Sequence, residues 1–128
     1  MPFLLDTNVV IHLRDGDPEI AAKVGALEGA VLMSIVTRVE LEGGVYRDPA
    51  HARLRRERLD VVLSAIPAVS FDADSADAYR VIVASAGYSR RTLLDRMIGA
   101  QALVHRATLV TMNPGDFSDI PGLTILAW

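Results

Sequence analysis

Four acidic residues stand far apart in this chain, where an alternation of strands and helices would bring them to one sheet edge: Asp6, Glu40, Asp95 and Asp116. Carboxylates that share a pocket raise one another's pKa and are unstable unless protons or a cation neutralise them. A donor set made only of oxygen atoms suits hard cations such as Mg²⁺ or Mn²⁺. The four residues therefore predict a divalent metal site.

Each acid also has an ordinary structural explanation when it is taken alone. Asp6 follows an apolar run and could cap the next helix. Glu40 stands three residues after Thr37, which is the spacing of a capping box. Asp95 could stabilise a helix N-terminus, and Asp116 lies beside an Asn-Pro-Gly turn, where acidic residues are common. The metal site hypothesis thus depends on whether the fold brings all four together.

Other polar residues near the acids could support such a site. Hydroxyl and amide groups hold carboxylates or a water molecule in position at many metal centres. The residues that we expect in this role are Ser34, Thr37, Thr111 and Asn113. The chain has no cysteine, and His12, His51 and His105 show no ligand spacing, so a zinc site is not expected.

Apolar runs and helical periodicities alternate along the chain. We expect helices around Val9 to Leu13, from Pro18 until Gly29, from Thr37 through Val45, over 50–65, from an Asp72 or Asp74 cap to Gly87, and over 93–106. The expected strands are 3–5, 31–33, 68–71, 108–111 and 123–126. This order favours an α/β fold of three layers, with a short, mostly parallel twisted sheet flanked by helices.

The predicted fold gives the acids a common location, because ligands of open α/β sheets bind beyond the carboxyl ends of the strands. Asp6 and Asp116 directly follow strands in this scheme, and Glu40 lies about one helical turn after another. Asp95 opens the helix that precedes the strand over 108–111, so its position depends more heavily on the fold.

Composition predicts one compact domain spanning 1–128, with a sizeable core, because 51% of the residues are hydrophobic. No apolar stretch reaches about 18 residues, so we expect no membrane segment and a cytoplasmic location. The net charge of −3 argues against a general binder of nucleic acids. Arginines nevertheless cluster locally and could contact phosphate, although a solvated helix face explains the first group as well: Arg53, Arg55, Arg56, Arg58, then Arg90, Arg91 and Arg96.

Four segments resemble PIN-domain proteins, and within them VapC-type toxins: FLLDTNVV at 3–10, SIVTRVELEGG at 34–44, LLDRMIGAQALVHRATLVTMNPGDF at 93–117 and IPGLTILAW at 120–128. The resemblance spans nearly the whole chain in register. It implies a Mg²⁺- or Mn²⁺-dependent endoribonuclease toxin of a type II toxin–antitoxin system. Such an enzyme hydrolyses phosphodiester bonds in structured RNA, such as a tRNA or an rRNA loop, and is neutralised by a VapB-type antitoxin.

The resemblance also implies roles for individual residues. Asp6, Glu40, Asp95 and Asp116 match the four catalytic and metal-binding acids, and Thr7, Asn8 and Thr111 match polar supporting positions. A homodimer is implied as well. Two residues depart from the pattern, because Gly99 stands where alanine is usual and Met112 where arginine or another polar residue is common.

Two other functions fit parts of this pattern. A phosphotransferase with an aspartyl nucleophile also uses a strand-end Asp and Mg²⁺. It is disfavoured, because Asn8 stands where the haloacid-dehalogenase type would have a second Asp and Lys23, the only lysine, is in the wrong place. The alternative that stays open is a non-catalytic PIN-like module that binds RNA or protein.

Overall fold

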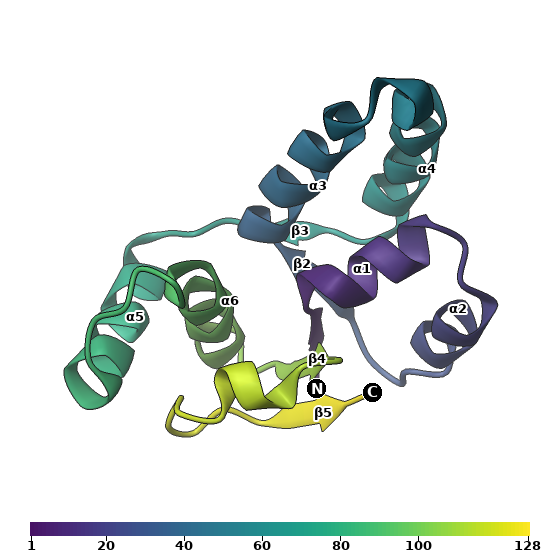
Figure 1. Cartoon of the computed structure of the whole chain (residues 1–128). Helices are drawn as coiled ribbons and strands as arrows, with labels where there is room; N and C mark the ends of the chain where they lie inside the picture. The colour runs from purple at the N-terminus through teal and green to yellow at the C-terminus, as the bar shows by residue number, and fades with distance from the viewer.

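The computed structural model describes residues 1–128 as a parallel sheet with helices on both faces (Figure 1). The strands are β1 (Phe3–Leu5), β2 (Val31–Ser34), β3 (Ala68–Val69), β4 (Thr108–Thr111) and β5 (Ile125–Ala127). The helices are α1 (Thr7–Arg14), α2 (Pro18–Gly25), α3 (Ile35–Arg47), α4 (Ala52–Ala65), α5 (Ala73–Ala86) and α6 (Leu93–Val104), with 3₁₀ turns η1 (Pro49–His51) and η2 (Pro114–Phe117). None of the helices has the length and apolarity needed to span a bilayer.

The strand order is β3-β2-β1-β4-β5, and every neighbouring pair is parallel. The central strand β1 pairs Leu5 with Met33 of β2 and with Val110 of β4. Parallel strands need crossover connections, and α-helices supply them here except between β4 and β5, where the connection contains only η2. The predicted three-layer α/β fold is confirmed.

Two hydrophobic clusters lie on the two faces of the sheet, because successive strand residues point to opposite sides. Leu5 and Val110 belong to the cluster under α1, α2 and α4, whereas Leu4 and Leu109 belong to the cluster under α5 and α6. Helix α3 contributes to both clusters, through Leu41 on one side and Val36 on the other. The helices in Figure 1 accordingly form one group around α1 and α2 and another around α5 and α6.

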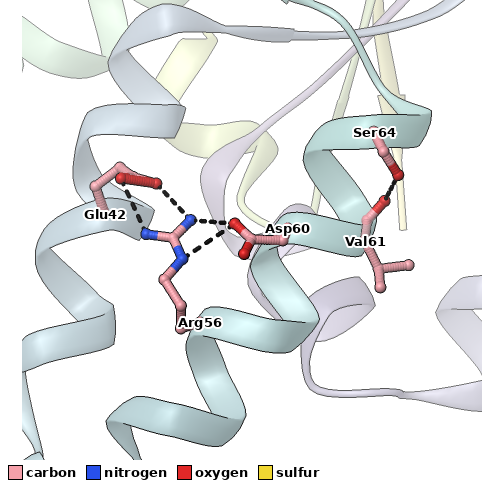
Figure 2. A network of polar contacts seen from close by, with 5 residues as sticks. All are labelled: Glu42, Arg56, Asp60, Val61 and Ser64. Atoms are coloured by element: carbon pink, nitrogen blue, oxygen red, sulfur yellow. Dashed lines mark hydrogen bonds and ion pairs between the residues drawn. The ribbon is translucent and has the colours of Figure 1, made fainter.

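Helices α3 and α4 are joined by a charged network at their exposed side (Figure 2). The Arg56 guanidinium donates to both oxygens of Glu42, at 3.1 and 2.9 Å, and to Oδ1 of Asp60 at 2.6 and 3.0 Å. These bonds lower the pKa of Glu42 below its ordinary value. Arg56, one of the clustered arginines, therefore uses its donors to connect α4 with α3.

Several element boundaries differ from the sequence predictions. The capping box of Thr37 and Glu40 is wrong, because Ser34 is the N-cap of α3 and accepts a hydrogen bond from the Val36 amide at 2.9 Å. Helix α2 ends at Gly25 rather than Gly29, and α6 ends at Val104 rather than 106. Strand β3 is only two residues long, and β5 begins at Ile125 rather than 123. The N-cap of α5 is Asp72, as one of the two predicted alternatives had it.

Gly99 lies in the buried part of α6 rather than on an exposed face. A Cβ at this position would stand 2.5 Å from Cδ1 of Ile120, which belongs to the same hydrophobic cluster as Ile98 and Ala100. Ile120 thus occupies the space that the methyl group of an alanine at position 99 would need. Met112 packs against the other cluster, which explains its apolar character.

Candidate metal and catalytic site

Asp6 occupies the point where β1 ends and α1 begins. Its extended backbone makes it the N-cap of α1, and its Oδ1 accepts a hydrogen bond from the Thr7 amide at 2.8 Å. Its Oδ2 accepts a second bond from the Thr111 hydroxyl at 2.8 Å, across from β4. The carboxylate is buried yet oriented by two donors from different elements. Both the structural and the functional predictions for Asp6 are therefore compatible with its position.

The hydroxyl groups of Thr7 and Thr37 support the side chain of Glu40. The Thr7 hydroxyl donates to Oε1 of Glu40 at 3.0 Å, and its oxygen lies 2.9 Å from that of Thr37. Since the single hydroxyl proton of Thr7 is donated to Glu40, the Thr37 hydroxyl is the donor in its bond with Thr7. Thr37 is fully buried, so it anchors these hydroxyl groups to the body of α3. Glu40 itself is exposed, and the Thr7 hydroxyl fixes its Oε1.

Asp95 lies in the first turn of α6. A helix that precedes a parallel strand runs from the carboxyl edge of the sheet back to its amino edge, so the N-terminus of α6 lies at the same edge as Asp6. Burial, followed by the charges of Asp6, Asp116 and Glu40, raises the pKa of Asp95 to about 6. The structure thus brings the other three acids within electrostatic reach of Asp95.

The pKa of Asp6 is also raised. Burial is the main cause, while the hydrogen bonds from Thr111 and Thr7 lower it and the charge of Asp116 raises it again. Asp116 reaches this region from η2, the turn after β4, and is exposed. Two of the four carboxyl groups therefore resist ionisation, mainly because they are desolvated and secondly because like charges lie near them.

No basic side chain neutralises this cluster. Every ion pair of the chain involves other acids, and none includes any of the four. No three His, Cys, Asp or Glu side chains, however, lie close enough together to hold a metal ion between them. Mg²⁺ keeps several water ligands and commonly uses only one or two carboxylates, so an open oxygen cluster of this kind fits it.

The predicted supporting residues divide into two groups. Thr7, Thr37 and Thr111 contact the acids or one another as described. The side chains of Asn8 and Asn113 are exposed and make no hydrogen bond within the chain. The backbone N–H of Asn113, however, donates to the Thr111 hydroxyl at 3.0 Å.

Ser34 contacts none of the four acids. It is buried and donates to Oε1 of Gln101, whose amide group in turn donates to the Val69 carbonyl at 2.9 Å. Its role is to tie β2 to α6 and to cap α3. Buried hydroxyl groups require partners, and those available here are not at the acid cluster.

A pocket of about 320 Å³ borders the acid cluster and is lined by three arginines: Arg14, Arg47 and Arg55. Arg55 is one of the clustered arginines of the sequence, whereas Arg14 and Arg47 were not predicted. A helical spacing could have found both. Arg14 lies seven residues after Thr7 on α1, and Arg47 lies seven residues after Glu40 on α3, which places each on the same helix face as a site residue.

Comparisons with known proteins agree with this geometry. A family model described as the PIN domain matches residues 3–123. Ribonuclease VapC2 of Rickettsia felis is 25% identical over 135 residues, an alignment that covers 100% of this chain and 98% of that protein.

Two solved structures share the fold. DNA-bound VapBC from Salmonella typhimurium has a TM-score of 0.86 at 25% identity, covering 100% of this chain and 98% of that one. A toxin–antitoxin complex from Klebsiella pneumoniae has a TM-score of 0.76 at 27% identity, covering 97% and 95%. The family model spans nearly the whole chain. The chain belongs to the PIN domain family.

Proposed function

We propose that this protein is a Mg²⁺- or Mn²⁺-dependent endoribonuclease, a VapC-type toxin that hydrolyses phosphodiester bonds in structured RNA such as a tRNA or an rRNA loop. The observation that carries the proposal is the cluster of four carboxylates without a basic partner. Its support also includes the full-length similarity to a protein named ribonuclease VapC2. A cluster that resists its own ionisation gains most from a cation.

Asp6, Asp95 and Asp116 would hold the cation, either directly or through its water ligands, with Glu40 beside them. A bound Mg²⁺ or Mn²⁺ would lower the pKa of an attacking water and offset the charge that develops on the phosphoryl oxygens. The protein's own contribution is to keep the carboxylates in place. The bonds from Thr7 and Thr111 do this for Asp6, since they satisfy one lone pair on each of its oxygens.

Glu40 is suited to receive a proton from the attacking water. The water oxygen would form a bond to phosphorus, the P–O bond to the leaving ribose oxygen would break, and no covalent enzyme intermediate is needed. The Thr7 hydroxyl fixes Oε1 of Glu40, while Oε2 accepts no hydrogen bond within the chain. A positioned carboxylate with a free oxygen is a suitable general base.

The proposed partners follow from the same chemistry. A VapB-type antitoxin would neutralise the toxin by placing a basic side chain among the carboxylates that otherwise bind the cation. The structure from Klebsiella pneumoniae, a toxin–antitoxin complex, supports a partner of this kind. We further propose that the toxin forms a homodimer within that complex. The cytoplasmic location stays a prediction.

The test is cleavage of total RNA by purified protein with Mg²⁺, Mn²⁺ or EDTA, read by mapping new RNA ends. Asp6→Asn and Asp95→Asn should abolish discrete, metal-dependent cuts while the fold persists. Asp77→Asn is the matched control, because Asp77 is exposed on α5 and forms no ion pair. Undiminished metal-dependent cleavage by Asp6→Asn would overturn the assignment.

The alternative is a non-catalytic PIN-like module that binds RNA or protein. It is favoured by one observation, the lack of three acidic side chains close enough together to enclose an ion. Mn²⁺ affinity, measured by calorimetry, separates the two functions. A folded, antitoxin-free protein that neither binds Mn²⁺ nor cleaves RNA would be such a module.

A further inference from the structure

The pocket beside the acid cluster lies between α1, α3 and α4, which contact one another in pairs (Figure 1). Thr7 and Glu40 line the pocket, and Glu40 is one of the four clustered acids, so the pocket directly borders the acid cluster. The remaining charged side chains of its wall are Arg14, Asp15, Arg47 and Arg55. A cationic pocket therefore adjoins an anionic site across one shared wall.

Arg47 and Arg55 have free donors. Arg47 is exposed and forms no ion pair within the chain. Arg55 is half-buried, and its one hydrogen bond runs from Nη1 to the Gly44 carbonyl at 3.2 Å. A guanidinium group carries five N–H donors, so most of those on both side chains are available to a ligand.

Arg14 is fixed at the wall of the pocket. Its side chain is only 6% exposed, and its Nε donates to Oδ1 of Asp15 at 3.0 Å. Its Nη1 lies close to Gly44, where a Cβ would stand 3.6 Å away. A buried guanidinium that is only partly compensated adds a constant positive potential to the pocket.

We propose that this pocket binds a backbone phosphate of the RNA substrate, adjacent in the strand to the phosphodiester that is cleaved. Arg47 and Arg55 would contact its oxygens directly, and Arg14 would contribute charge. The inference rests on the proposed ribonuclease function. It adds a subsite that determines where along the strand the scissile bond lies.

An RNA strand fits this arrangement for two reasons. The whole chain carries a net charge of −3, so attraction for a polyanion must come from local groups rather than from the overall field. RNA also carries one phosphate per nucleotide, so a strand with one phosphate at the acid cluster necessarily places another nearby. The planar fork of arginine matches phosphate oxygens in pairs.

The test uses a fluorescent, single-stranded oligoribonucleotide of mixed sequence, with anisotropy measured in EDTA over a series of salt concentrations. We expect Arg47→Gln and Arg55→Gln each to weaken binding by about fivefold and to reduce the slope of log K against log salt by about 0.7. Arg53→Gln is the matched control. It lies on the same helix as Arg55 with its side chain 95% exposed, but it does not line the pocket.

Cleavage by the same variants separates this inference from the proposed function. If the wild type cleaves RNA, Arg47→Gln and Arg55→Gln should raise KM and leave kcat unchanged, because a remote phosphate contact binds substrate and transition state alike. Equal effects of all three substitutions on an active enzyme would overturn the subsite alone. Selective weakening with no cleavage by the wild type would keep an RNA phosphate site and reject the nuclease.

Two further outcomes are decisive. Absence of RNA binding by the wild-type protein would overturn the subsite. Loss of affinity for a VapB-type antitoxin without any change in RNA binding would assign the pocket to an acidic group of a protein partner, and would also reject the phosphate.

Discussion

The ionised form of Asp95 is unfavourable in the folded protein, because the side chain is partly desolvated and three other carboxylates act on it. Functional sites commonly accept such a penalty, since the same geometry is favourable once a cation is present. The penalty has a direct consequence for stability in the absence of metal.

Asp95→Asn should stabilise the metal-free protein at neutral pH. An unfolded Asp titrates near pH ~3.9, whereas the folded carboxyl has a pKa of about 6. Between these values the native state binds more protons than the unfolded state, so the free energy of unfolding falls as pH rises from about 4 to 6. With allowance for solvent screening, the substitution should add about 1 kcal/mol near neutral pH.

The measurement is urea unfolding in EDTA near pH 5 and near pH 7, with Asp77→Asn as the control for removing an exposed negative charge. Asp95→Asn should flatten this part of the pH dependence, and Asp77→Asn should leave it as in the wild type. A destabilised Asp95→Asn at neutral pH would show that the carboxylates do not repel one another as the geometry indicates.

Helix α6 illustrates an interaction that no helical periodicity reveals. Gly99 is unfavourable in a helix, yet Ile120 fills the space that a Cβ would need. Gly99→Ala should therefore cost about 1 kcal/mol, because overpacking of about 1–3 kcal/mol exceeds the gain in helix propensity of about 0.5–1 kcal/mol. Ile120→Val removes Cδ1, so the double variant should be more stable than the two single effects predict when added.

A double-mutant cycle by urea unfolding measures this coupling, with a favourable interaction of about 1 kcal/mol expected for residues in contact. Leu109→Ile, in the same hydrophobic cluster, is a control that leaves the Gly99 contact intact. Additive effects of Gly99→Ala and Ile120→Val would mean that Ile120 moves aside at no cost.

The elements themselves were largely predictable, since apolar runs such as 3–5 and 108–111 are buried strands of the expected length. The sequence could also indicate Asp6, because a polar residue directly after a buried strand must lie at the sheet edge. The prediction of Thr37 as a helix cap was wrong. The spacing between Thr37 and Glu40 matches a capping box, but Ser34 is the N-cap of α3. Only tertiary structure shows that Thr37 contacts Thr7.

The grouping of Ser34 with the site failed for a related reason. The residue stands at a strand end like Asp6, but its partner Gln101 is far away in sequence and no local pattern announces it. The sequence does not reveal the arginine pocket, because only Arg55 belongs to one of its arginine clusters. Arg14, Arg47 and Arg55 come from three helices, and only their packing brings them together.

At the scale of the whole molecule, opposite charges are separated within one small domain. The acid cluster lies at the carboxyl edge of the sheet, the arginine pocket borders it, and Glu40 is common to both. A divalent cation would reduce the repulsion at the first site and so make both compatible with a polyanion. Stability should consequently depend on metal even though the fold does not need metal to form its core.

Mn²⁺ should raise the free energy of unfolding of the wild type near pH 7, by about 2.7 kcal/mol at a concentration about 100 times its Kd. The increase should be smaller near pH 5, because protons compete for Asp95, whose pKa is about 6. Asp6→Asn and Asp95→Asn should reduce the increase, and Asp77→Asn should retain it. Because this readout needs no RNA, equal stabilisation of all four proteins would place any bound cation outside the acid cluster, whatever the outcome of the cleavage assay.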